Sequence, residues 1–72
     1  MVVKLFATLR EGRGKETDIP WHEGTDGYAI LKALALKPGD VKIFLVNGMH
    51  SKFEVKLKPD DVISLFPAVG GG

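Results

Sequence analysis

The 72-residue sequence predicts an α+β domain in which one mixed β-sheet carries a single helix across one face. Segments rich in β-formers stand at both ends of the chain, and one short segment with helical spacing lies between them. The dipeptide Asn47-Gly48 adds a strong signal for a tight hairpin turn. We therefore expect the order β-β-α-β-β-β in a single domain over residues 1–72, with the first and last strands adjacent in the middle of the sheet.

The N-terminal third is expected to form a β-hairpin. Residues 2–10 alternate between the two sides of a strand, so Phe6 faces away from the core. The core side of this strand is expected to carry Val3, Leu5, Ala7 and Leu9. Two glycines in residues 11–14 suit a tight turn, and residues 15–22 return as a weaker strand that Pro20 confines to the edge of the sheet.

One short helix is expected after this hairpin. Thr25 or Asp26 offers an N-cap, and residues 28–36 have an apolar stripe that packs on the sheet. The stripe consists of Ile30, Leu31 and Leu34. Residues 37–40 end the helix, because Pro38 cannot continue it. Two aromatic residues are assigned to packing in the core and on the helix, namely Trp21 and Tyr28.

Three strand segments are expected after the helix. Residues 41–46 form the first, and the turn at Asn47-Gly48 leads into a return that begins at Met49 and His50. The return is expected to continue as a strand over residues 52–58, since apolar and charged residues alternate there. Its apolar residues are Phe53, Val55 and Leu57. Residues 62–66 are so apolar that this last strand must lie inside the sheet.

Composition excludes several classes of function. The chain has no cysteine, so neither a disulfide framework nor a thiolate metal site is expected. Ten basic and nine acidic residues are scattered without a basic block, so nucleic acid is not expected as a partner. No charged leader and no apolar run of membrane-spanning length is present, so we expect no membrane partner and a cytoplasmic location. His22 and His50 lie outside any H-E-x-x-H pattern, and no metal site or catalytic role is expected for them.

The C-terminal segment 66–72 is expected to present a reactive chain end. It runs from an apolar strand through Pro67 into a free carboxylate at Gly72, and Gly70 and Gly71 keep the approach to that carboxylate slender. We expect residues 67–72 to form a flexible tail, and its six residues would span roughly 20 Å when extended. The alternative is that the glycines are only slack, since chain ends are commonly frayed.

A partner-binding surface is expected on the face of the sheet that the helix leaves open. Alternation places Phe6, Leu45 and Phe66 on that face, next to Pro67 and the tail. An uncovered apolar patch of this kind is typical of a surface that binds another protein. The alternative is that these side chains fill space under a loop.

The chain resembles the ubiquitin-like sulfur carriers of the ThiS and MoaD group over its whole length. The resemblance rests on four segments in order: residues 3–11 (VKLFATLRE), 45–48 (LVNG), 57–69 (LKPDDVISLFPAV) and the final Gly71-Gly72. Residues 65–69 are most similar to the MoaD branch, the small subunit of molybdopterin synthase. Two departures are Asp60-Asp61, where the family usually has Gly-Asp, and the third glycine at position 70.

This resemblance implies a β-grasp fold and a carrier that is not itself an enzyme. It implies that an E1-like adenylyltransferase, similar to ThiF or MoeB, uses ATP to adenylate the Gly72 carboxylate, after which sulfur replaces AMP. The chain itself would bind no cofactor. The resulting thiocarboxylate would supply sulfur to a MoaE-like or thiazole synthase-like partner, for molybdopterin, thiamine thiazole or a thiolated nucleoside. Two alternatives stay open: a protein modifier conjugated through Gly72 to lysines, and an interaction module with an inert tail.

Overall fold

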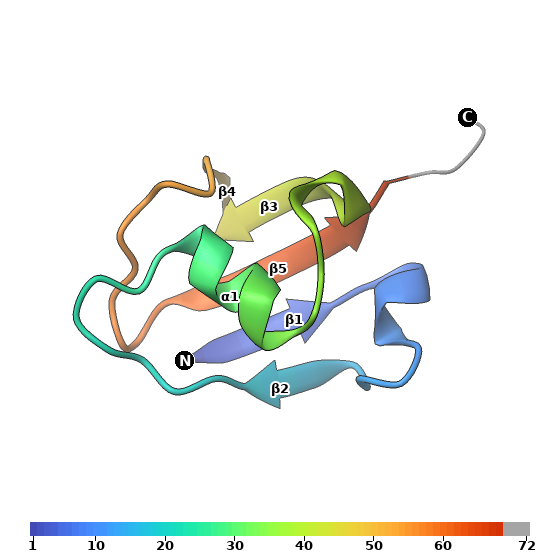
Figure 1. The fold of residues 1–72 in the computed structure, drawn as a ribbon, viewed down its shortest axis with the longest axis horizontal. Helices are drawn as coiled ribbons and strands as arrows, with labels where there is room; N and C mark the ends of the chain where they lie inside the picture. The colour runs from blue at the N-terminus through green and yellow to red at the C-terminus, as the bar shows by residue number, and fades with distance from the viewer. Residues whose placement is uncertain (69–72) are drawn as a thin grey trace.

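The computed structural model describes residues 1–68, which form a five-stranded mixed sheet with one α-helix. The strand order is β2-β1-β5-β3-β4; β1 and β5 are parallel, and the other neighbours are antiparallel (Figure 1). The strands are β1 (Val2–Leu5), β2 (Glu16–Asp18), β3 (Val41–Val46), β4 (Met49–His50) and β5 (Val62–Pro67). The helix is α1 (Gly27–Ala33), and two short 3₁₀ helices are η1 (Ala7–Arg10) and η2 (Pro38–Asp40). The predicted topology, with the first and last strands paired at the centre, is confirmed.

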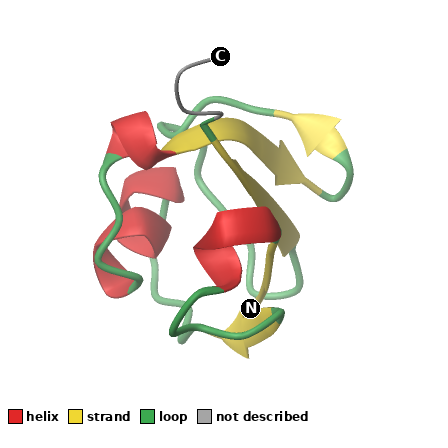
Figure 2. Ribbon diagram, turned by 90° about the vertical axis from the view of Figure 1, so that its right-hand side faces the viewer, coloured by secondary structure: helices red, strands yellow, loops and turns green. Residues whose placement is uncertain are grey.

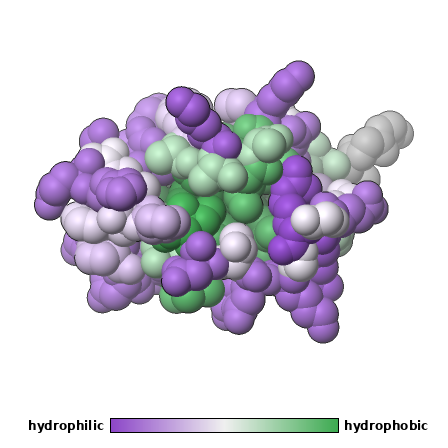
Figure 3. All heavy atoms as spheres, turned by 60° about the horizontal axis from the view of Figure 1, so that its bottom comes forward, coloured by the Kyte–Doolittle hydropathy of each residue, from purple (hydrophilic) through white to green (hydrophobic). Residues whose placement is uncertain are grey.

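The core lies between the sheet and α1, which covers one face only (Figure 2). Its largest fully buried side chains come from both layers: Val3, Leu5, Ile30, Leu31, Ile63 and Leu65. Leu34 packs against this cluster but stays partly exposed. Seen from the β2 edge, apolar side chains show through between polar ones (Figure 3), so the helix does not close the core completely on that side.

The first strand is shorter than predicted. It ends at Leu5 rather than at residue 10, because Ala7 has a φ of 51° and turns the chain into η1. Ala7 is exposed instead of buried, whereas Leu9 reaches the core from η1. Alternation alone predicted too long a strand. A long strand and a short strand that ends in a tight turn bury the same residues at their start, so the pattern does not distinguish them.

The helix begins where its cap predicts and ends early. Asp26 is the N-cap, and its Oδ1 accepts a hydrogen bond from the Ala29 N–H at 3.0 Å. Ala35 has a φ of 58°, so the helix closes before residue 36. At its start, the Gly27 N–H donates to the Phe53 carbonyl oxygen at 2.7 Å, and a Cβ on Gly27 would lie 2.7 Å from the Phe53 Cα. Glycine therefore permits close packing of α1 on the loop after β4.

That loop is not the strand predicted over residues 52–58. Between β4 and β5, strand pairing is limited to an isolated bridge between Asp26 and Lys56. The alternation of apolar residues reflects burial of one side of an extended loop, in which Leu57 is 4% exposed. The turn before β4 was predicted correctly, because Asn47 and Gly48 have the positive φ values of 52° and 83° that a type I′ turn needs.

The two aromatic residues assigned to packing differ from each other. Trp21 is partly buried, and its Nε1–H donates to the Leu57 carbonyl oxygen at 2.7 Å. Tyr28 is 45% exposed and lies outside the core, with its ring 5.5 Å from that of Phe53. Among residues 1–68, no helix is long and apolar enough to cross a membrane.

Candidate functional site

The open face of the sheet is built around two stacked aromatic rings. Parallel pairing sets Leu5 beside Leu65 in the core. The residues that follow them, Phe6 and Phe66, therefore lie beside each other on the opposite face of the sheet. Their ring centroids are 4.2 Å apart with an interplanar angle of 9°. Both side chains are partly exposed, since no helix covers this face. The predicted phase of these two residues is confirmed.

Strand β3 continues the apolar surface across the sheet. Ile43 lies opposite Phe66, and Leu45 lies opposite Ser64, whereas Phe44 between them is buried in the core. We call Phe6, Ile43, Leu45 and Phe66 the open-face patch. Our sequence prediction omitted Ile43, although the alternation that places Leu45 outward also places Ile43 there.

The chain leaves the sheet beside this patch. Pro67 is the last residue of β5 and pairs with Val41, and the Ala68 N–H donates to the Asp40 carbonyl oxygen at 3.1 Å. Strand β1 has already ended at this level, so Pro67 needs no donor on that side. The first two residues of the expected tail are thus held by the sheet and by η2. Gly70, Gly71 and Gly72 lie outside the described residues.

The other end of β5 is fixed by a buried carboxylate. Asp61 accepts hydrogen bonds from the Lys58 N–H at 2.8 Å and from Asn47 Nδ2 at 2.9 Å. Asn47 Oδ1 in turn accepts from the Val62 N–H at 2.9 Å. The bond from the Lys58 backbone, and next the bond from Asn47, hold the pKa of Asp61 below its ordinary value. The Asp60-Asp61 turn therefore keeps the acidic residue at the position that anchors the strand.

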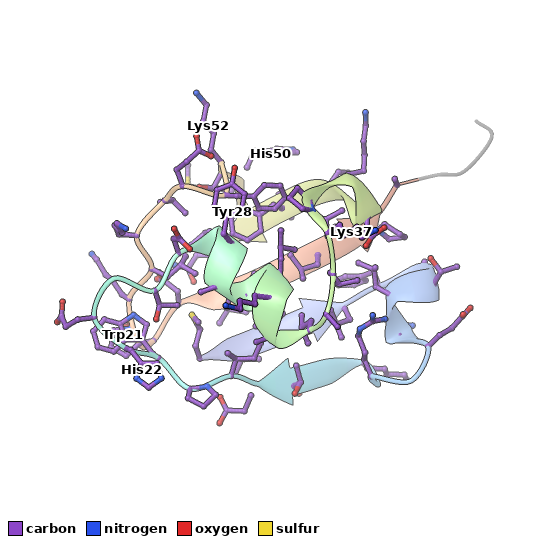
Figure 4. The ribbon with its side chains drawn as sticks, in the orientation of Figure 1. Trp21, His22, Tyr28, Lys37, His50 and Lys52 are labelled. Carbon is purple, nitrogen blue, oxygen red and sulfur yellow. The ribbon has the colours of Figure 1, made fainter. Side chains whose placement is uncertain are left out.

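Other chemistry-bearing residues do not gather into a site. His22 lies in the loop after β2 and His50 lies in β4, far from each other, and both are exposed (Figure 4). Within residues 1–68 there is no pocket and no cluster of three His, Asp or Glu side chains that could hold a metal ion. The candidate site is therefore the open-face patch together with the chain that leaves it.

Comparison with known proteins assigns the family. The model of the ThiS family matches residues 3–72, which is nearly the whole chain. The chain belongs to the ThiS family. No curated protein matches it in a sequence search.

Solved structures similar to this ThiS-family chain have the same fold. A putative molybdopterin converting factor, subunit 1, from Pyrococcus furiosus is 26% identical, with a TM-score of 0.78 over 94% of this chain and 95% of that chain. A complex of subunits 1 and 2 of the molybdopterin-converting factor from Helicobacter pylori is 26% identical, with a TM-score of 0.62 over 99% and 96% of the two chains. Small archaeal modifier protein 1 of H. volcanii has a TM-score of 0.77 at 21% identity over 94% and 95%, which shows the fold alone.

These similarities confirm the β-grasp, ubiquitin-like fold and the resemblance to the ThiS and MoaD group. They support a ThiS/MoaD-like carrier or another ubiquitin-like protein. The family match runs from residue 3 to residue 72, so its range includes Phe6 and Gly72. No individual role of Phe6, Leu45, Phe66 or Pro67 follows from the match, and these roles remain predictions.

Proposed function

We propose that this ThiS-family protein is a sulfur carrier whose Gly72 carboxylate is adenylated and then converted to a thiocarboxylate. The observation that carries the proposal is the family match, which continues through the tail to residue 72. The structure adds a suitable arrangement, because β5 joins the open-face patch directly to that tail. The protein binds no cofactor in this proposal; its partner uses ATP.

The proposed chemistry needs activation because a carboxylate is a poor electrophile. The terminal carboxyl group, with an ordinary pKa of about 3.3 to 3.7, is ionised at neutral pH. Its oxygen attacks the α-phosphorus of ATP, and pyrophosphate leaves. A hydrosulfide-equivalent nucleophile then attacks the acyl carbon, so that a C–S bond forms, the bond to AMP breaks and AMP leaves with its electron pair. This step requires no oxidation or reduction. The thiocarboxylate is then the sulfur donor to the acceptor enzyme.

Two partners follow from this chemistry. The first is an E1-like adenylyltransferase of the ThiF and MoeB kind, which binds the open-face patch and takes Gly70 to Gly72 into its active site. The second is the sulfur-accepting synthase, MoaE-like or thiazole synthase-like. The Helicobacter pylori neighbour is a complex of two molybdopterin-converting subunits, which favours a synthase partner of the MoaE kind for this chain too. We place the protein in the cytoplasm, where these partners and ATP would be found.

The test is ATP–pyrophosphate exchange with the activating enzyme of the same organism. An alanine added after Gly72 moves the carboxylate by about 3.5 Å, and a displacement near 1 Å can already cost about 10²-fold when reacting atoms must align. We expect no exchange from this variant or from Gly71→Val, whose branched side chain fills the narrow approach. Both variants keep every residue of the open-face patch and should bind the enzyme as the parent does. Parent-like exchange by the extended variant would contradict the proposal.

A protein modifier conjugated through Gly72 is the second candidate, favoured by the shared fold of small archaeal modifier protein 1. Both functions begin with the same adenylation, so exchange does not separate them. Intact-mass spectrometry of protein from its native host separates the two functions. A carrier gains only the mass difference between sulfur and oxygen, whereas a modifier forms isopeptide-linked adducts with other proteins. An interaction module with an inert tail would keep full partner affinity after deletion of residues 70 to 72 and would show no exchange.

A further inference from the structure

One cation is fixed on the aromatic pair of the open-face patch. The guanidinium carbon of Arg10 lies 5.5 Å from the centroid of the Phe6 ring, which is within cation–π range. Arg10 Nε also donates to the Leu5 carbonyl oxygen at 2.9 Å. These two contacts orient the guanidinium and leave its terminal nitrogens without a hydrogen-bond partner among residues 1–68. Its planar pair of donors matches a carboxylate.

Arg13 shows what a structural arginine looks like in the same segment. Its Nε donates to the Leu34 carbonyl oxygen at 3.1 Å, and its Nη1 donates to two more carbonyl oxygens. Those bonds tie the segment after η1 to the end of α1. Arg10 makes a single hydrogen bond of this kind, from Nε to Leu5, and its terminal nitrogens make none within residues 1–68.

A second cation stands on the other side of the chain exit. The pairs Val41 with Pro67 and Ile43 with Phe66 place two residue steps of β3 against one step of β5, so Lys42 is the extra residue of a β-bulge. Bulges redirect side chains, and here Val41 returns to the core while Lys42 is exposed. Figure 1 shows η1, which bears Arg10, and the start of β3 on opposite sides of the C-terminal end of β5.

Neither cation is neutralised within residues 1–68. The one ion pair in that range joins the Met1 amino group to Asp18, at the opposite end of β1. Asp40, the acidic residue nearest to Lys42 in sequence, instead accepts the Lys37 N–H at 2.8 Å. An apolar patch with an oriented arginine and an exposed lysine beside it is complementary to an apolar surface that carries acidic side chains.

We propose that Arg10 and Lys42 bind acidic side chains of the activating enzyme, on either side of the apolar surface that receives Phe6 and Phe66. This inference rests on the proposed function and specifies the chemistry of the partner surface. The two cations set the orientation of the docked carrier, because they flank the point from which the chain continues to Gly72. They act in binding and positioning and take no part in the adenylation itself.

The experiment measures association rate constants with the activating enzyme of the same organism at about 0.05 M and about 0.5 M NaCl, where the Debye length falls from about 14 Å to about 4 Å. The variants are Arg10→Gln, Lys42→Gln and the double variant. Lys32→Gln is the matched control. Lys32 is exposed on α1, so this replacement removes the same charge from the side of the sheet that the helix covers. Thermal denaturation accompanies each variant, and Lys42 makes no side-chain hydrogen bond among residues 1–68 that its replacement would break.

We expect each single variant to associate about 3-fold more slowly at low salt and the double variant about 10-fold more slowly, with the difference nearly absent at high salt. Lys32→Gln should match the parent, and Arg10→Lys should recover part of the loss. The same losses should appear in proteins that lack residues 70–72. A loss that is independent of salt would overturn the inference, because it would show a packing role. So would disappearance of the effect without residues 70–72, which would mean that the cations serve the chain's own carboxylate. A parent that neither binds nor supports exchange would instead overturn the proposed function, and the inference with it.

Discussion

Two adjacent residues of β5 should respond to truncation in opposite ways. Leu65 is fully buried and pairs with Leu5 on one side and with Phe44 on the other. Replacing a buried leucine with alanine costs about 2 to 5 kcal/mol, against a total stability of about 5 to 15 kcal/mol for a domain. At about 4 to 8 °C per kcal/mol for a domain of this size, Leu65→Ala should lower the melting temperature by at least about 8 °C.

Phe66→Ala should instead impair binding more than folding. The Phe66 ring is partly exposed and stacks on Phe6, and such a pair contributes about 0.5 to 1.5 kcal/mol beyond the area it buries. Loss of an aromatic anchor from a protein interface typically costs more than about 1 kcal/mol of binding energy. Phe6→Ala should behave in the same way, since it removes the other ring.

The assays are thermal and urea denaturation of each variant, with isothermal titration calorimetry against the activating enzyme. A Leu65→Ala protein that melts within a degree or two of the parent would contradict the assigned core. Unchanged affinity of Phe66→Ala, together with a loss of stability as large as that of Leu65→Ala, would show that the aromatic pair belongs to the core instead. The first result would contradict the side of β5 that we assign to the core, and the second would contradict the binding role of the open-face patch.

Two further predictions concern stability. Gly27→Ala should destabilise the fold by about 1 to 3 kcal/mol, as overpacking does. The added Cβ would lie 2.7 Å from the Phe53 backbone, which cannot move as a side chain can. A urea midpoint equal to that of the parent would contradict this packing. Asp61→Asn should flatten the acid dependence of stability: the pKa of Asp61 is lowered in the folded state, so its contribution is present above about pH 4 and is lost as pH falls through the folded pKa. Urea unfolding of parent and variant between neutral pH and about pH 2.5 measures it, and equal pH profiles would refute the assignment.

The fold could be predicted from sequence because its strongest signals are local. Asn47 and Gly48 set a two-residue turn, Asp26 caps α1, and the largely apolar sequence of β5 favours a central position. The errors arose where alternation was the sole guide. It extended β1 through Ala7, which has a positive φ, and it read the loop over residues 52–58 as a strand. One-sided burial produces alternation whether or not a neighbouring strand supplies hydrogen bonds.

The candidate site divides in the same way. The phase of Phe6 and Phe66 follows from alternation, and so could that of Ile43. Alternation does not predict the contact of Arg10 with the Phe6 ring, which depends on η1, or the exposure of Lys42, which depends on a β-bulge. A bulge is a feature of the pairing between two strands, so it cannot be predicted from the sequence of either strand alone. The geometry that leads us to assign these two charges to partner binding therefore comes from the structure.

Docking and reaction are joined by one strand. Phe66 belongs to the open-face patch and Pro67 leads towards the chain end, and both lie in β5, between β1 and β3. The hydrogen bond from the Ala68 N–H to Asp40 extends this hold by one residue, so four residues are left to enter a partner. Four residues span at most about 14 Å, compared with roughly 20 Å for the six that follow Phe66. In the proposed complex, the nucleotide site of the activating enzyme must therefore lie within about 14 Å of Ala68. In that complex, docking through Phe6 and Phe66, with Arg10 and Lys42 fixing the orientation, would bring the chain end within this distance of the nucleotide.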